Sequence, residues 1–237
     1  MEIKYYQLQI MCERAKRELK VEEKNIIGYM NFDGIPSIGN SPKQIIKGKS
    51  SLKDFYLPSS DLGSRKILSS RCKELFEKNR KGNVRYIPCP LIQGNKTLND
   101  YWITDFIQFD DDEVDFDRSI FELCEGWVEK EENGIPIEFG EKFEEIKFQN
   151  LNEKLEFEKA KLNHLSKIRS VKLFMKQSCS LPFLHLRSFG VFDIIISEQL
   201  KTELQNEKMD KGIEFKPLEI PDEEWGGPNG LRKQFYN

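Results

Sequence analysis

Apolar and polar residues alternate along several short segments of the chain, and this two-residue period predicts β-strands. Eight segments are expected as strands: 3–10, 26–32, a short one at 52–56, 84–87, 101–109, 171–176, 191–196 and 212–218. Segment 101–109 stands out because it combines aromatic and β-branched residues. Pro88 and Pro90 follow segment 84–87, so this strand is expected at the edge or the end of a sheet.

Three segments show the apolar spacing of amphipathic helices. The first begins after Ser69, a suitable N-cap, and places Cys72, Leu75 and Phe76 on one face. The others span about 151–165 and about 198–208. Four leucines are expected on one side of the middle helix: Leu151, Leu155, Leu162 and Leu165.

Two stretches, 67–92 and 195–220, repeat one order of features. Each contains a short strand, a helix capped by serine, and a strand that ends in proline, which stops the ladder of hydrogen bonds. The pattern indicates two related β-α-β units, although any β-α-β stretch resembles another. Under both interpretations the helices pack on a sheet. The sequence therefore predicts an α+β fold with a mixed or antiparallel sheet and a few packed amphipathic helices.

The 237 residues suit one domain of this class, expected over 1–221. Two lobes, 1–145 and 146–221, are the alternative. Residues 33–62 contain many glycines and prolines and are expected to be largely irregular. The glycine-rich end, 222–237, is expected to form a loosely ordered tail, which Trp225 and two later aromatic residues would anchor.

The composition indicates a folded protein, since 38% of the residues are hydrophobic and 11% are aromatic. No apolar run approaches 18 residues and no secretory signal begins the chain, so neither a membrane span nor export is expected. The net charge of −3 does not suggest nucleic acid as a partner. Five scattered cysteines without a CxxC pair are expected to be reduced thiols, which favours a cytoplasmic protein.

Charge is distributed unevenly along the chain. Residues 105–145 hold 16 acidic and 3 basic residues, a net charge of −13, whereas residues 1–104 carry a net charge of +8. Six carboxylates in the dense part of this block are the candidate partner-binding residues: Asp110, Asp111, Asp112, Glu113, Asp115 and Asp117. This run is interpreted as a solvated loop, as a docking surface for a basic partner, or as a calcium site. The calcium interpretation lacks the central glycine of an EF-hand loop.

No motif in the chain points to catalysis. His164 and His185 have no partner at metal-ligand spacing, and no phosphate-binding or dinucleotide-binding glycine motif is present. Cys179 precedes His185 by six residues, so a hydrolase that uses this pair is the less favoured alternative. We therefore expect a protein that is not an enzyme and has no catalytic residue, cofactor or metal ion.

Features spread over most of the chain carry a resemblance to a known family. They are Tyr5-Tyr6-Gln7-Leu8, Leu68-Ser69 with the helix through Phe76, Val84–Pro88, Tyr101-Trp102-Ile103 before the acidic stretch, and Ile195-Ile196-Ser197 with its helix. In this order they resemble the immunity proteins of bacterial polymorphic toxin systems, in particular the immunity protein 11 group and its relatives. The resemblance implies a cytoplasmic protein that binds a cognate toxin effector domain and occludes its active site. The alternative is a general protein-interaction module without a toxin partner.

Overall fold

The computed structural model describes seven stretches of the chain, and every structural statement below concerns them alone: 3–10, 19–21, 44–46, 51–57, 65–132, 135–191 and 193–236. The expected strand at 26–32 and most of the irregular region 33–62 lie outside the described residues. Within 52–56, the structure has a strand of only two residues, Phe55–Tyr56.

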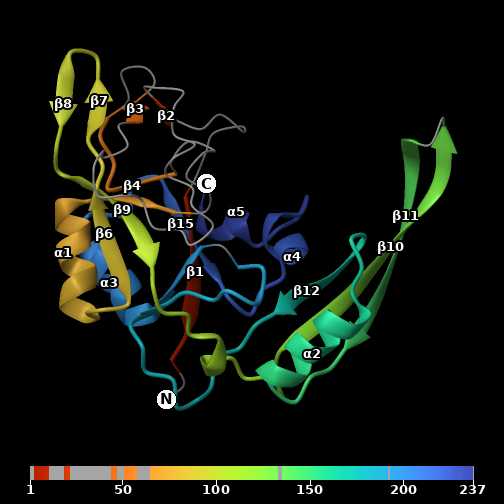
Figure 1. Cartoon of the computed structure of the whole chain (residues 1–237). Helices are drawn as coiled ribbons and strands as arrows, with labels where there is room; N and C mark the ends of the chain where they lie inside the picture. The colour runs from red at the N-terminus through yellow and green to blue at the C-terminus, as the bar shows by residue number, and fades with distance from the viewer. Residues whose placement is uncertain are drawn as a thin grey trace.

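Along the described chain, runs of strands are separated by helices (Figure 1). The strands are β1 (Tyr5–Ile10), β2 (Leu19–Val21), β3 (Gln44–Ile46), β4 (Phe55–Tyr56), β5 (Ile67–Ser69), β6 (Val84–Pro88), β7 (Leu91–Gln93), β8 (Lys96–Leu98), β9 (Tyr101–Phe106), β10 (Ile120–Glu132), β11 (Ile135–Ile146), β12 (Ser166–Lys172), β13 (Phe183–Leu184), β14 (Ile194–Ser197) and β15 (Ile213–Pro217). The helices are α1 (Ser70–Asn79), the 3₁₀ turn η4 (Asp111–Glu113), α2 (Leu151–Lys161), α3 (Glu198–Asn206), α4 (Asp222–Gly226) and α5 (Arg232–Phe235).

The described strands form four small sheets rather than one large one. Their orders are β13-β14-β1-β15, β4-β5-β9-β6, β2-β3-β7-β8 and β11-β10-β12. All pairings are antiparallel except β3 with β7. The α+β class with mixed and antiparallel sheets is confirmed, and β6 lies at a sheet edge as its prolines predict.

The two related β-α-β units are present and have the same topology. In one unit β5 and β6 flank β9, and in the other β14 and β15 flank β1. The registers also correspond, because Tyr101 lies opposite Ser69 and Tyr5 lies opposite Ser197. The middle strand follows the first unit in the chain but precedes the second, so the N-terminal strand completes the C-terminal unit.

The serines that begin the two helices adopt the same geometry. Ser69 and Ser197 both have extended backbone, and each hydroxyl accepts a hydrogen bond of 3.3 Å, from the amides of Cys72 and Leu200 respectively. Both were identified from sequence because a cap depends on residues only three positions apart.

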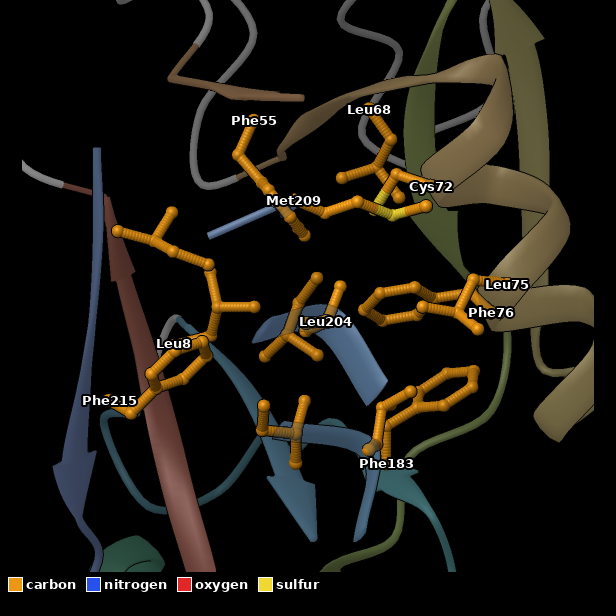
Figure 2. Packing of buried hydrophobic residues seen from close by; sticks show 14 of the residues in the cluster. Leu8, Phe55, Leu68, Cys72, Leu75, Phe76, Phe183, Leu204, Met209 and Phe215 are labelled. Carbon is orange, nitrogen blue, oxygen red and sulfur yellow. The ribbon is translucent and has the colours of Figure 1, made fainter. Parts of the chain in front are cut away.

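The two helices pack into one hydrophobic core. Figure 2 shows Cys72 and Phe76 of α1 facing Leu204 of α3. Leu8 of β1 and Phe215 of β15 belong to the same cluster and lie on its other side. All five side chains are buried. Because both units contribute residues to this core, they form one structural body, while each helix also packs on strands of its own unit.

The pairing of strands does not match the predicted lobes 1–145 and 146–221. β1 pairs with β14 and β15, and a boundary after residue 145 would cut the last residue from β11.

Two other expectations need correction. The helix expected over 151–165 ends at Lys161, and its face was wrong, since Leu155 is 38% exposed while Lys154 is buried. The Lys154 ammonium is satisfied by Glu158 at 2.7 Å and by the carbonyl of Ser188 at 2.6 Å. A buried lysine with such partners resists prediction because spacing alone treats it as polar and exposed.

Within 222–236, where a loosely ordered tail was expected, the structure has the short helices α4 and α5. Trp225 is only 4% exposed, and Arg232 binds the buried carboxylate of Glu214 through two nitrogens. The Tyr236 hydroxyl accepts a hydrogen bond of 2.8 Å from the amide of Phe215. The aromatic residues thus hold this segment against β15, despite its glycines.

Candidate functional site: the acidic arm and the segment that supports it

A long antiparallel hairpin, β10 with β11, projects from the body of the protein (Figure 1). We call residues 120–146 the acidic arm. β12 pairs with β10 only from Ile120 to Glu125, so the hairpin beyond this point has two strands. An isolated two-stranded hairpin has marginal stability in water, and this part of the arm is therefore suited to gaining contacts from a partner.

The acidic arm was not expected as a pair of strands. Its sequence holds 9 acidic and 2 basic residues, and glutamate and lysine are depleted in strands. One signal was available, because the two residues between β10 and β11 are Asn133 and Gly134, a pair typical of tight hairpins. The strand expected over 171–176 also lies elsewhere, since β12 spans Ser166–Lys172.

The base of the arm is anchored in the protein by aromatic packing. Phe121 is fully buried and lies 5.6 Å from the ring of Phe148, which in turn lies 5.6 Å from Phe157 of α2. Phe121 also contacts Phe116 at 5.7 Å. The arm is therefore fixed at one end, and the charges along it are held at a defined distance from the body.

Two large aromatic side chains of the arm are exposed, on opposite faces of the hairpin. Trp127 is 44% exposed and covers Gly140, where any side chain would collide with its ring. Phe143 is 48% exposed, and the Arg169 guanidinium lies 5.3 Å from its ring centre. Exposed aromatic residues bordered by polar or charged residues are typical of protein interfaces.

An ion-pair network fixes Arg169 on the Phe143 face. Its guanidinium lies 2.7 Å from Glu122 on the arm and 2.7 Å from Glu223 on α4. Hydrogen bonding to Glu122, opposed by burial, raises the pKa of Arg169, so this charge persists at any physiological pH. The network joins the arm to the C-terminal helices.

Asp110 does not face solvent as a docking residue would. It is buried and forms a two-point ion pair with Arg80, with nitrogen–oxygen distances of 2.7 and 2.9 Å. Its carboxylate also accepts a hydrogen bond of 3.1 Å from the amide of His185. These contacts make Asp110 a link between α1, the acidic run and the segment around His185.

Asp111 has a similar internal position. It is buried, and its carboxylate accepts hydrogen bonds from the amides of Arg187 and Ser188 at 2.8 and 3.3 Å and from the Ser188 hydroxyl at 2.7 Å. The carboxylates of Asp110 and Asp111 therefore accept hydrogen bonds from donors of the same chain. We no longer count these two buried residues among the candidates for contact with a partner.

The other four candidates lie nearer the surface. Asp112 and Asp117 are exposed, and Glu113 and Asp115 are half-buried. Asp115 accepts a hydrogen bond of 3.3 Å from the amide of Arg118, which closes a turn. No group of three or more metal-ligating side chains is found among the described residues, which include this run. Asp112 and Asp117 remain candidates for contact with a partner.

Cys179 and His185 do not form a nucleophile–base pair in this structure. The Cys179 sulfur accepts a hydrogen bond of 3.1 Å from Tyr5, and burial raises the pKa of its thiol. His185 stacks on Phe106 with 4.2 Å between ring centres, and burial lowers the pKa of its imidazole. Since the thiolate is the reactive form, the environment of Cys179 disfavours nucleophilic chemistry.

His185 lines a cavity of about 260 Å³ between the two units. Its walls are Arg65, Lys66, Thr104, Asp105, Phe106, Phe109, His185, Leu186, Arg187 and Ile194. In this wall, Asp105 binds Arg65 at 3.2 Å and Lys66 binds Asp193 at 2.9 Å, while the Arg187 guanidinium lies 5.3 Å from the ring centre of Phe109. The cavity thus presents no free charge from these two pairs, and the acidic arm is the better candidate site.

No protein-family model matches this chain, and no curated protein matches it either. The likeness to bacterial immunity proteins therefore stays a prediction from sequence. Within the parts of the chain that the structure describes, no helix combines the length and the apolar character required to cross a bilayer.

Proposed function

We propose that this protein acts by binding another protein, and that the acidic arm is the main contact surface for a partner with a basic face. The single observation that carries the proposal is the arm itself. It is anchored at its base, two-stranded beyond Glu125, and exposes a tryptophan among carboxylates.

The physical properties of the arm suit fast and specific association. With 9 acidic and 2 basic residues, its field attracts a basic partner and raises the association rate at low salt. Trp127 offers a large apolar area that becomes buried on contact, which is the usual character of an interface hot spot. The charges would supply speed and selectivity, and the aromatic residues would supply affinity.

The partner we propose is a cognate toxin effector domain, which the protein would neutralise in the cytoplasm by covering the toxin's active site. This step rests on the resemblance to immunity proteins of polymorphic toxin systems. Cys72, Cys124 and Cys179 are buried and free, which is compatible with a reducing compartment. The alternative, a general interaction module, would bind several partners weakly through the same arm.

The experiment compares two variants that change total charge equally. One reverses Glu129, Glu141 and Glu145 of the arm to lysine, and the control reverses three exposed glutamates of the body: Glu74, Glu207 and Glu224. The probe is the toxin domain encoded beside this gene, measured for association rate and for protection of cells that express it.

Under the proposal, the arm variant associates at least about tenfold more slowly at low salt, with a weaker salt dependence, while the control variant changes little. Equal slowing in both variants would assign the effect to net charge alone and refute the arm as the contact surface. Absence of binding and of protection by the wild-type protein would refute the toxin as partner.

A further inference from the structure

The outer edge of β11 is unpaired among the described strands. In the sheet order β11-β10-β12, β11 pairs only with β10 and lies at the edge over its whole length, Ile135–Ile146. An edge strand presents backbone N–H and C=O groups that can pair with a further strand. Most folded proteins obstruct such edges, so a long open one calls for an explanation.

The tip of the arm is obstructed, but the rest of β11 is not. Two register shifts interrupt the pairing near Lys130, and Pro136 lies in the tip and lacks an N–H group. Bulges and prolines are the usual means of blocking an edge. From Gly140 to Ile146 the register is regular, without proline or bulge. The open edge is therefore confined to this stretch.

One hydrogen bond determines which amides face outward. The Gly126 amide of β10 donates to the carbonyl of Leu165, on the β12 side, at 3.1 Å. Backbone groups alternate in direction along a strand, so those of Trp127 and Glu125 point toward β11. Their partners in the register are Gly140 and Lys142.

It follows that three residues of β11 direct their backbone groups to the open edge: Glu141, Phe143 and Glu145. All three side chains are exposed. Consecutive outward residues are two positions apart, which is the spacing that an added antiparallel or parallel strand requires.

Charge identifies the kind of strand that fits this edge. Glu141, Glu144 and Glu145 surround it, so a second copy of the chain would bring like charges together, which is unfavourable across neighbouring strands. A basic strand would instead place lysine or arginine beside these carboxylates. The side chains of Glu141, Phe143 and Glu145 lie on one face of β11, because residues two positions apart in a strand point to the same side. The aliphatic stems of lysines on that face would also cover Phe143.

We propose that the partner adds a basic β-strand to the outer edge of β11, paired with Glu141, Phe143 and Glu145. The proposal rests on the proposed function and specifies how the acidic arm binds. Backbone pairing gives affinity that depends little on sequence, while Glu141 and Glu145 select basic strands, whose lysine stems pack on Phe143.

The test removes a backbone N–H group that points to the open edge of β11 and keeps those that bond to β10. Glu141→Pro deletes an N–H group that faces the edge and leaves the hydrogen bonds to β10 in place, and Glu141→Gln is the control for the lost charge. The probe is a synthetic peptide of about eight residues that alternates valine and lysine, a length that matches the open stretch.

The peptide is expected to bind the proline variant at least about tenfold more weakly than the glutamine variant, since one or two hydrogen bonds are lost. In the wild-type protein, the peptide should slow hydrogen exchange at the amides of Glu141, Phe143 and Glu145. The amides of Lys142 and Glu144 already bond to β10, so their exchange should change less. This second measurement does not depend on any variant folding correctly.

The outcomes separate this inference from the proposed function. Equal peptide binding by the proline and glutamine variants, with exchange unchanged at the three outward amides, would overturn strand addition. The arm would still be the contact surface if reversal of its charges slows association with the toxin domain. A dimer in sedimentation that the Glu141→Pro variant abolishes would also overturn the proposal, because it would show that the edge accepts a second copy.

Discussion

The half-buried Arg80 and the buried Asp110 form a two-point ion pair that joins the end of α1 to the acidic run. Arg80 also donates to the carbonyl of Phe183 at 2.8 Å, and Asp110 exchanges hydrogen bonds with the backbone of His185. The Asp110 carboxylate thus anchors the densest acidic part of the chain, residues 110–117, to the body of the protein. This contact explains how a run of like charges is held in place.

Replacing Asp110 by alanine should lower the free energy of unfolding by about 3 kcal/mol, because Arg80, whose side chain is only 15% exposed, loses its counter-ion. Urea unfolding measures the change. Asp112→Ala is the control, and the exposed position should change stability by no more than about 0.5 kcal/mol. A similar loss in both variants would mean that the run acts through its total charge and not through this pair.

The two helix caps should differ in strength despite their shared geometry. Ser197→Ala should cost about 1 kcal/mol of stability, the usual value for a lost N-cap. Ser69→Ala should cost more, since the Ser69 hydroxyl also donates to the buried carboxylate of Asp54. Thermal or urea unfolding of both single variants checks the order, and a larger effect at Ser197 would contradict it.

The sequence predicted what depends on near neighbours and missed what depends on distant ones. The caps and the buried face of α1 follow from residues within one or two helical turns, and both are confirmed. The inward position of Asp110 depends on Arg80, 30 residues away, and on His185, 75 residues away. No local pattern separates such a carboxylate from the exposed Asp112 beside it.

The acidic arm shows the same limit for strands. Its glutamates disfavour strand prediction, yet the pairing of β10 with β11 is stabilised by tertiary anchors such as Phe121. The Asn133-Gly134 pair was the one local sign of the hairpin. Charge density singled out residues 105–145 and placed the candidate residues in the first part of this block, whereas the projecting strands come after them.

Stability should fall as the pH is lowered through about 6.5, partly through His185. Burial, then the charge of Lys66, lowers the pKa of this imidazole, although Asp110 and Asp111 act in the opposite direction. Below about pH 6.5 the unfolded chain therefore takes up a proton that the folded chain does not, and folding becomes less favourable. Urea unfolding at pH 7.5 and 5.5 measures the difference.

His185→Gln should reduce that loss of stability between the two pH values. Replacement of the exposed His164 by glutamine is the control and should leave the loss unchanged. An identical pH dependence in the His185→Gln variant and the wild type would show that other groups produce it.

Gly140→Ala should displace the indole of Trp127 from the arm, since the added methyl group would occupy the place of the ring. We expect a destabilisation of about 1–3 kcal/mol, as in other overpacked sites, and a shift of the Trp127 indole signal in an NMR spectrum. Gly226→Ala is the control, because a side chain there meets no atom within 4 Å. An unchanged indole signal would mean that Trp127 is not held by Gly140.

The exposed carboxylates of the acidic run can be tested separately from the arm. Asp112→Lys with Asp117→Lys reverses the two fully exposed members of the run and leaves the ion pair of Asp110 and Arg80 intact. If the run contributes to docking, association with the toxin domain should slow by severalfold at low salt, and raising the salt should remove the difference. If the Asp112→Lys/Asp117→Lys variant associates as fast as the wild type while the arm variant associates more slowly, the arm contacts the partner and the acidic run only holds the arm in place. That result is expected if the partner pairs with β11, because the run lies at the base of the arm and the open edge lies along its length (Figure 1).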